Sequence, residues 1–423
     1  MEKHYQILIV GGGNAGLSIA SQLFRKRKGL NIGIIEPSEN HYYQPAWTLV
    51  GAGIFDIKKT VRNEKDFIPK NTTWIKDAVA EFNPTVNKVT CSSGKEISYD
   101  YLIVCSGIQL DWNKIKGLKE TLGKNNVSSN YNFNTAPYTW EMIKNFKGGT
   151  AVFTNPSTPI KCGGAPHKIM YLAVDYWRKK GILDKCDVHY VSGATVIFGV
   201  PEYKATLEKV LKNGNIKVHY SANIIAIDGN NKTIEFETKN TEFVKQSLSK
   251  SAAGCYSIAA GNDADSVSRV TMNFDLCHSV PPQSAPDFIK NSPLRDQANA
   301  FGYVEVDKIT MQHSRFPNVF ALGDCTNAPC SKTGAAIRKQ APVVVTNLLE
   351  VMDKKALTAS YDGYSACPIP TQYGKLMLAE FDYANKPKMT FPFDQAKPRW
   401  TMWILKTKVL PWLYWNKILK GTA

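Results

Sequence analysis

The stretch Gln6-Ile-Leu-Ile-Val-Gly-Gly-Gly-Asn-Ala-Gly16 decides the fold of this 423-residue chain. Its apolar run predicts a buried parallel strand, and the glycines that follow have the G-x-G-x-x-G spacing of a dinucleotide-binding turn. In such a turn Gly11 permits the tight bend, Gly13 lets a pyrophosphate approach the backbone, and Gly16 lets the next helix pack on the strand. Residues 17–27 predict that helix, with its amino-terminal end facing the phosphates.

The residues around this turn supply the other parts of a dinucleotide site. Asn14 and Ala15 complete the phosphate-binding turn. Residues 31–36 predict a second strand that ends in Glu36, twenty residues after Gly16. An acid at that position accepts hydrogen bonds from the ribose hydroxyls. Strand, turn, helix, strand and acid together predict a nucleotide site, whereas the glycine spacing alone would be weak evidence.

Two later segments indicate which dinucleotide is bound. Residues 99–105 predict a further strand of the same sheet, with its glycine turn at Gly107. Residues 316–324 form an apolar strand that ends in Gly-Asp. This ending resembles that of glutathione-reductase-like flavoproteins, in which the aspartate, here Asp324, binds the ribityl chain of FAD. The resemblance implies FAD rather than NAD.

The chain is predicted to be an α/β protein with two Rossmann-like, glutathione-reductase-like dinucleotide-binding domains and a C-terminal amphipathic membrane-associated segment. Its length suggests two or three domains. We expect a discontinuous FAD-binding domain from residues 1–134 and 271–360, and a second Rossmann-like domain at 135–270. Residues 361–423 are expected to form a C-terminal region that holds a redox cysteine and contacts a membrane.

The second Rossmann-like domain is predicted from alternating strands and helices. Its polar, small residues at 240–270 predict a surface excursion. The expected strands are 150–154, 187–191 and 217–220, and the expected helices are 167–180 and 204–213.

The composition predicts a globular protein with an anionic partner. The formal net charge is +16, which favours nucleic acid or an acidic membrane surface. Nine cysteines show no paired C-x-x-C spacing, so we expect no zinc site and mostly buried thiols. No signal peptide or transit segment is recognised before the first strand.

Cys162 stands where a nicotinamide-binding flavoprotein would repeat the glycine fingerprint. Strand residues 149–155 are followed by Pro156 and a loop without the G-x-G-x-x-G spacing. Prolines remove amide donors that a phosphate site would use, so NADH is not expected as the electron donor. A helix start and nearby basic residues favour a reactive thiolate at Cys162. Those basic residues are Lys161, His167 and Lys168.

Five segments resemble the sulfide:quinone oxidoreductase family, specifically the type found in mitochondria and some bacteria. The resemblance covers nearly the whole chain, and its motifs are specific. The segments are Asn40-His-Tyr-Tyr-Gln-Pro-Ala-Trp-Thr-Leu-Val-Gly-Ala-Gly53, Pro159-Ile-Lys-Cys-Gly-Gly-Ala-Pro-His-Lys-Ile-Met-Tyr-Leu172, Gly323-Asp-Cys-Thr-Asn327, Tyr361-Asp-Gly-Tyr-Ser-Ala-Cys-Pro368 and Ala379-Glu-Phe-Asp-Tyr383.

The resemblance implies that Cys162 and Cys367 are the catalytic cysteines. Cys325 and Cys330 stay open as rival partners, because sequence separation says nothing about the distance between two thiols. Gln44 and Lys332 are further expected cofactor contacts. Some relatives link the flavin covalently to a cysteine, but none lies between Cys105 and Cys162, so we expect noncovalent FAD.

The implied reaction oxidises hydrogen sulfide to sulfane sulfur or a persulfide. Hydrosulfide would attack a bridge between the two cysteines, either a disulfide or one lengthened by a sulfur atom. FAD would then pass two electrons to a quinone, ubiquinone or menaquinone. A small thiol, sulfite or another sulfur acceptor would remove the sulfane sulfur, and a homo-oligomer is possible.

The last thirty residues predict a membrane surface contact. No acid follows Asp394, and the apolar positions fit two short amphipathic helices broken at Pro411. An ordinary helix packed on the core is the alternative. We expect a peripheral, monotopic protein on the cytoplasmic face of a bacterial inner membrane, or on the mitochondrial inner membrane if the source is eukaryotic. The basic and aromatic residues there are Lys397, Arg399, Lys406, Lys408, Lys417, Lys420, Trp400, Trp403, Trp412, Tyr414 and Trp415.

Three other functions would share some of these features. A type II NADH:quinone oxidoreductase would carry a second glycine fingerprint, and a flavocytochrome c sulfide dehydrogenase would work with a haem subunit. A basic nucleic-acid-binding module would explain the charge but not the settings of Glu36, Asp324 and Cys162. No nucleic-acid partner is therefore expected.

Overall fold

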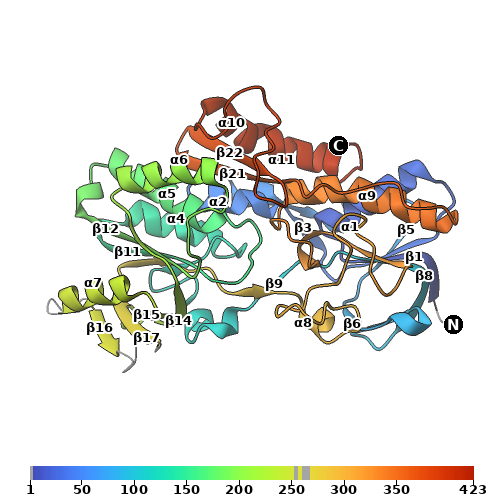
Figure 1. The fold of residues 1–423 in the computed structure, drawn as a ribbon, viewed down its shortest axis with the longest axis horizontal. Helices are drawn as coiled ribbons and strands as arrows, with labels where there is room; N and C mark the ends of the chain where they lie inside the picture. Colours follow the sequence, from blue (N-terminus) through green and yellow to red (C-terminus); the bar gives the residue numbers. More distant parts are fainter. Residues whose placement is uncertain (1–2, 252–255, 260–266) are drawn as a thin grey trace.

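The first lobe of the molecule is built on a seven-stranded sheet (Figure 1). The computed structural model describes residues 3–251, 256–259 and 267–423. The predicted first strand and helix are β1 and α1, and β1 pairs in parallel with β2 and β8. The bounds are β1 Lys3–Val10, α1 Asn14–Lys26, β2 Ile32–Ile35, β5 Thr72–Ile75, β6 Val79–Asn83, β7 Lys88–Cys91, β8 Glu96–Val104 and β20 Val319–Ala321, in the order β5-β2-β1-β8-β7-β6 with β20 beside β8.

The second lobe holds a five-stranded parallel sheet in the order β10-β18-β11-β12-β13. The first sheet is parallel from β5 to β8 and antiparallel at β7 and β6, and the second is parallel throughout. Parallel strands with covering helices confirm the predicted α/β class. Strands β10 and β18 lie just outside the predicted 135–270 segment, so this sheet draws on residues from both sides of it. The bounds are β10 Val127–Ser128, α4 Ala136–Asn145, β11 Gly149–Asn155, α5 Ala165–Lys179, β12 Cys186–Ser192, α6 Pro201–Asn213, β13 Lys217–His219 and β18 Leu276–His278.

A four-stranded antiparallel sheet corrects the predicted surface excursion at 240–270. Val270 and Met272 are buried and alternate with more exposed residues along β17, the pattern of a strand with one covered face. Helix α7 covers that face with Phe243, which is 1% exposed. Residues 252–255 and 260–266 of the predicted excursion lie outside the described residues. The elements are β14 Ala222–Asp228, β15 Thr233–Thr238, α7 Thr241–Ser251, β16 Tyr256–Ala259 and β17 Ser268–Asn273.

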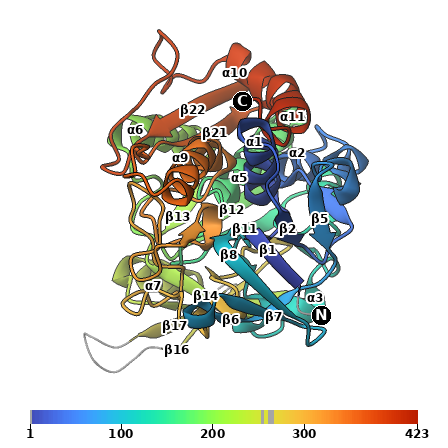
Figure 2. The same ribbon diagram turned by 90° about the vertical axis from the view of Figure 1, so that its right-hand side faces the viewer.

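A C-terminal hairpin and a helical segment lie across the top of both lobes in Figures 1 and 2. The hairpin is β21 Ser365–Gln372 and β22 Lys375–Phe381, and β21 contacts α5. Residues 400–418 are helical throughout, so the predicted break at Pro411 is wrong. The turns before and after Pro411 have π-helical hydrogen bonds, which accommodate its missing amide. Among the described residues, no helix has the length and apolar character needed to cross a bilayer.

One side of this helical segment belongs to the core of the first lobe. Tyr414, Trp415 and Leu419 are buried in the cluster that contains β1. The Tyr414 hydroxyl and His41 Nε2 share a 2.7 Å hydrogen bond. Side chains of α1 also donate to backbone carbonyls at the end of the chain, including Ser21 Oγ to Leu419 O at 2.7 Å. The other side is open to solvent, with Trp412 55% exposed.

Replacing Tyr414 with Phe tests this docking. The change leaves His41 Nε2 buried without a partner, which should lower the free energy of unfolding by about 1–3 kcal/mol. Denaturant titration followed by circular dichroism measures the loss. Trp412→Phe, on the exposed side of the same segment, should change stability by no more than about 0.5 kcal/mol. If Tyr414→Phe and Trp412→Phe had the same free energy of unfolding, the hydrogen bond between Tyr414 and His41 would not stabilise the docked segment.

Candidate active site

The loop between β11 and α5 presents Cys162 in a fixed, unusual conformation. Its φ is +52°, a left-handed value that a residue with a Cβ adopts at a cost. Two backbone bonds hold it: Cys162 N donates to Lys332 O at 2.8 Å, and Ala165 N donates to Cys162 O at 2.7 Å. The loop thereby fixes the thiol at the amino-terminal end of the 15-residue helix α5.

Strand β21 brings Cys367 to Cys162. Cys367 is 2% exposed, and its thiol hydrogen-bonds to that of Cys162. A Cβ on Gly164 would lie 2.7 Å from Cys367 Sγ, so only glycine leaves room for this approach. The rival cysteines are held elsewhere: Cys325 Sγ lies 3.4 Å from the carbonyl oxygens of Val104 and Leu322, and Cys330 Sγ lies 3.5 Å from Gln340 Nε2.

The two thiols differ strongly in acidity. The hydrogen bond from Cys367 lowers the pKa of Cys162 well below its usual value, and the Lys168 ammonium, 3.0 Å from Cys162 Sγ, lowers it further against the effect of burial. The same shared hydrogen bond, together with burial, raises the pKa of Cys367 well above its usual value. Because Lys168 Nζ lies 3.0 Å from Cys162 Sγ, the geometry favours Cys162 as the thiolate of the pair and Cys367 as its thiol.

Three lysines surround the pair. Burial lowers the pKa of Lys168, but the nearby thiols raise it more, and the net shift is upward. Burial lowers the pKa of Lys161 to about 8, opposed by Asp324 and Cys162. Burial and the Lys168 charge lower the pKa of Lys406 to about 8. The site is thus positively charged and suits an anionic sulfur species.

His167 does not act as the cationic neighbour that the sequence predicted. The ring is 1% exposed, and burial followed by the Lys168 charge lowers its pKa to about 3. The imidazole is neutral at physiological pH, so it adds no positive charge beside Cys162.

Lys406 is a site residue that the sequence reasoning assigned to the membrane surface. It is 6% exposed, and its ammonium donates to Pro45 O at 2.9 Å. The sequence held one sign of this position: Lys406 follows the apolar Met402 by four residues, and residues four apart lie on one helix face. In the structure both side chains are buried.

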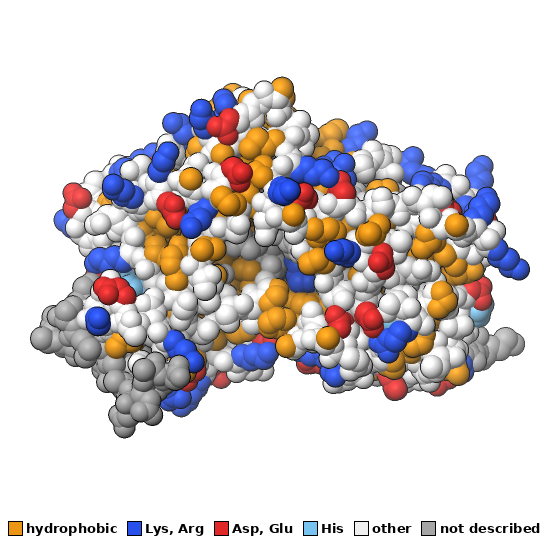
Figure 3. Space-filling model, in the orientation of Figure 1, with side chains coloured by type: hydrophobic (Ala, Val, Ile, Leu, Met, Phe, Trp, Pro, Cys, Tyr) orange, Lys and Arg blue, Asp and Glu red, His pale blue; other side chains and the backbone are white. Residues whose placement is uncertain are grey.

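The predicted dinucleotide site fits a flavin dinucleotide. Gly11 has φ +102°, and a Cβ there would lie 2.7 Å from Cys105 O, whereas a Cβ on Gly13 or Gly107 would meet nothing within 4 Å. The turn is therefore tight at Gly11 and open where a pyrophosphate would approach. On the face that Figure 3 draws, the surface is hollowed between the two lobes.

The polar groups expected around the cofactor include two carboxylates and an asparagine, Glu36, Asp324 and Asn14. Glu36 accepts hydrogen bonds from Gly12 N and Ser38 N, both at 2.8 Å, which fixes its carboxylate at the end of β2. Asp324 Oδ1 and Asn14 Oδ1 are buried without a protein partner. Burial raises the pKa of Asp324, and Lys332 and Lys161 oppose the rise. Buried acceptors without partners are expected where a ligand supplies the donors.

The remaining predicted contacts have these positions. Ala15 and Gly16 are buried in the first turn of α1. Gln44 Oε1 lies 2.5 Å from Lys161 Nζ. Lys332 Nζ donates to Asp324 O at 2.7 Å and to Thr326 O at 2.9 Å, which ties it to the backbone beside Asp324.

The known proteins to which this chain is similar are pyridine nucleotide-disulphide oxidoreductases and sulfide:quinone oxidoreductases. Residues 5–139 match the family model described as pyridine nucleotide-disulphide oxidoreductase. The chain is 46% identical to the mitochondrial sulfide:quinone oxidoreductase of Dictyostelium discoideum, over 98% of this chain and 86% of that protein. It is 41% identical to the Mus musculus protein of the same name, over 99% and 87%. The fold is similar to that of the Aquifex aeolicus sulfide:quinone oxidoreductase structure, with a TM-score of 0.79, 18% identity and coverage of 99% and 92%.

Replacing Lys168 with Met tests the charge on Cys162. Removing the ammonium takes away a cause of the low thiol pKa, so the pH at which Cys162 becomes reactive should rise toward that of an ordinary thiol. The rate of alkylation of the reduced protein by iodoacetamide, followed as a function of pH by peptide mass spectrometry, measures this midpoint. Lys209→Met, an exposed lysine on α6, is the matched control and should leave the midpoint unchanged. An unshifted Lys168→Met profile would refute the assignment.

Proposed function

Because the chain belongs to the sulfide:quinone oxidoreductase family, we propose that it oxidises sulfide at the Cys162–Cys367 pair and passes the electrons through a flavin to a quinone. The observation that carries this assignment is the contact between the two thiols beside the Lys168 ammonium. Disulfide exchange requires a good thiolate leaving group, and these thiols have opposite pKa shifts.

The order of sulfur transfer follows from that asymmetry. In the oxidised enzyme the two sulfurs are bonded, directly or through an additional sulfur atom. In the direct disulfide, hydrosulfide attacks the sulfur of Cys367, the bond to Cys162 breaks, and Cys162 leaves as the thiolate that Lys168 stabilises. Cys367 then carries the persulfide, and an external acceptor removes the sulfane sulfur. The two thiols that remain re-form their bond by giving up two electrons and their proton.

We propose noncovalent FAD as the flavin. The residues that would hold it are those of the fingerprint turn (Gly11, Gly13, Asn14, Ala15, Gly16) with Glu36, Gln44, Gly107, Asp324 and Lys332. The bound flavin supplies a two-electron acceptor for the cysteine pair and a donor for the quinone. The pair lies beside Lys161, whose ammonium bonds to Gln44, and the Cys162 amide bonds to the Lys332 carbonyl, so the candidate thiols and cofactor contacts share one scaffold.

The quinone, ubiquinone or menaquinone, places the enzyme at a membrane surface. We propose peripheral association through the exposed side of residues 400–418, where Trp400 is 64% and Trp412 is 55% exposed. Exposed tryptophans beside lysines suit the headgroup region of a bilayer. The mitochondrial names of the relatives support the mitochondrial inner membrane in a eukaryote, and the cytoplasmic face of the inner membrane would be the equivalent in a bacterium.

The identity of the acceptor and the oligomeric state are further proposals. A small thiol or sulfite would suit the positively charged site, because each reacts as an anion. A homo-oligomer remains a prediction. NADH is not favoured as the donor, because the loop after β11 carries Cys162 in place of a second glycine fingerprint.

The cysteine assignment is tested by Cys162→Ser and Cys367→Ser. Each change removes one sulfur of the bridge, so sulfide-dependent quinone reduction should fall by more than about 100-fold while the flavin absorbance is retained. Cys330→Ser should keep near-normal turnover. Sulfide, and not NADH, should bleach the yellow wild-type protein. Near-normal turnover in Cys367→Ser would exclude the assigned pair.

The membrane contact is tested by the double variant Val409→Ser/Trp412→Ser. Val409 and Trp412 are 44% and 55% exposed, so the substitutions spare the core and remove apolar surface that would enter the bilayer. Sedimentation with phospholipid vesicles should weaken by about tenfold. Bleaching of the flavin by sulfide should stay at the wild-type rate. Unchanged sedimentation would refute this surface as the contact.

A further inference from the structure

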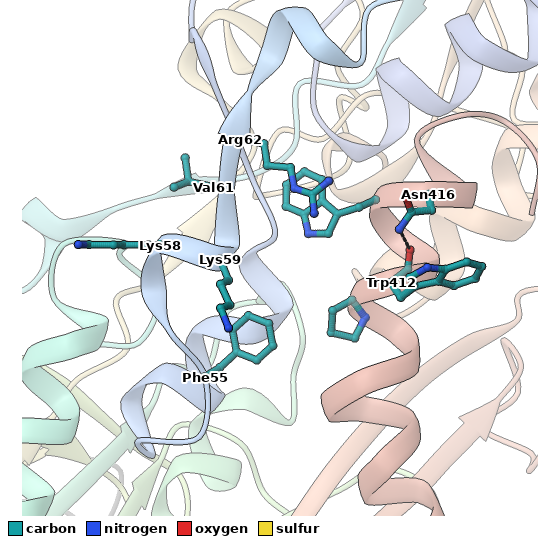
Figure 4. Close-up of a pocket in the computed structure, with 9 residues that line it drawn as sticks. Phe55, Lys58, Lys59, Val61, Arg62, Trp412 and Asn416 are labelled. Carbon is teal, nitrogen blue, oxygen red and sulfur yellow. Dashed lines mark hydrogen bonds between the residues drawn. The ribbon is translucent and has the colours of Figure 1, made fainter.

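A cleft of about 420 Å³ lies beside the C-terminal helical segment and has no part in the sulfur chemistry. One wall is the loop and strand at residues 55–62, and the other is the helical segment around Pro411 and Trp412 (Figure 4). The residues that line it are Phe55, Lys58, Lys59, Val61, Arg62, Pro411, Trp412, Trp415 and Asn416.

The lining combines positive charge with apolar surface. Lys58, Lys59 and Arg62 are exposed, and in the described part of the chain none of them forms an ion pair with an acid. Asp56, the acid at the start of the loop, caps the following turn by accepting from Lys58 N at 2.9 Å. Phe55, Val61 and Pro411 supply the apolar surface.

The two walls are held in place by the fold. Thr60 O accepts from Tyr43 N at 2.7 Å, and the Thr60 hydroxyl accepts from Trp47 Nε1 at 3.2 Å, which fix the basic loop. Arg62 joins the walls, because its guanidinium stacks 4.5 Å above the ring of buried Trp415. The cleft is therefore built before any ligand binds.

We infer that this cleft binds the headgroup of an anionic phospholipid. The inference rests on the proposed membrane association and names the lipid chemistry that this surface recognises. A phosphate suits the unpaired cations, and the glycerol and first acyl carbons suit the apolar wall. A free anion would make no use of the apolar wall. A neutral quinone would leave the three cations without a negatively charged partner.

The position of the cleft matches this ligand. Trp412 lines it and is also part of the exposed side of the helical segment, so a headgroup in the cleft would lie where that segment meets the bilayer surface. Lys408 and Lys417 are exposed on the same segment and add positive charge. A bound headgroup would hold the enzyme against the membrane in one orientation.

The test compares two double variants that remove the same charge. Lys58→Gln/Lys59→Gln removes two of the three cations that line the cleft and leaves the Arg62 stack intact. Lys119→Gln/Lys124→Gln removes two exposed lysines at and after α3 (Leu118–Thr121), which lies far from the C-terminal segment (Figure 2). Each holoenzyme is sedimented with vesicles of phosphatidylcholine alone and of phosphatidylcholine mixed with phosphatidylglycerol. Retained flavin absorbance and circular dichroism check the fold.

We expect the wild type and the Lys119/Lys124 control to bind phosphatidylglycerol vesicles equally and more tightly than phosphatidylcholine vesicles. The Lys58/Lys59 variant should lose about tenfold or more of its binding to the anionic vesicles and none to the neutral ones. Inorganic phosphate should compete no better than chloride at equal ionic strength, since it lacks the apolar part of the lipid.

Several results would overturn the inference. Equal losses in the two double variants would show an unspecific charge effect, and strong competition by phosphate would show a free-anion site. A raised KM of the Lys58/Lys59 variant for a water-soluble quinone without vesicles would assign the cleft to the quinone. If the wild type failed to bind either vesicle, the proposed membrane association itself would fail; equal binding to both vesicles would refute only the headgroup site.

Discussion

The contact between the Lys168 ammonium and the Cys162 sulfur is the interaction on which the rest of the site depends. Lys168 is 2% exposed, and burying an unpaired ammonium would cost several kcal/mol. The thiolate supplies the missing negative charge at 3.0 Å, and the lysine in turn keeps the thiol ionised. The Lys168 ammonium and the Cys162 thiolate therefore stabilise each other's charge inside the protein.

This pairing explains the local sequence around the thiol. Cys162 and Lys168 lie on either side of the start of α5, so the helix places the ammonium beside the sulfur and adds its own positive end. Gly164 leaves the space that Cys367 needs, and Pro166 occupies the first turn, where a missing amide is harmless. The loop that replaces a nucleotide-binding turn is therefore a thiolate site built at the same helix end.

The sequence predicted the parts of the molecule that depend on local pattern. The fingerprint turn at Gly11–Gly16 has a strict spacing set by backbone geometry, and the parallel strands of both large sheets follow from apolar runs alternating with amphipathic helices. The approach of Cys367 to Cys162 depends on a hairpin packing on α5 more than 200 positions along the chain, so only resemblance pointed to it. His167 and Lys406 were misjudged for one reason: sequence gives the residue type but not the burial that makes one neutral and draws the other into the site.

The C-terminal segment joins the cysteine pair to the proposed membrane contact. One of its sides carries Lys406 to the cysteine pair and Tyr414 to His41, while the other side holds Trp412 in solvent. A segment that only anchored the protein would need no buried lysine, and one that only packed on the core would not expose two tryptophans. Because the buried contacts and the proposed membrane contact share one helical segment, deleting it would damage the cysteine site and the first-lobe core as well. Substitutions confined to the exposed side are therefore the changes that separate attachment to the membrane from sulfur chemistry.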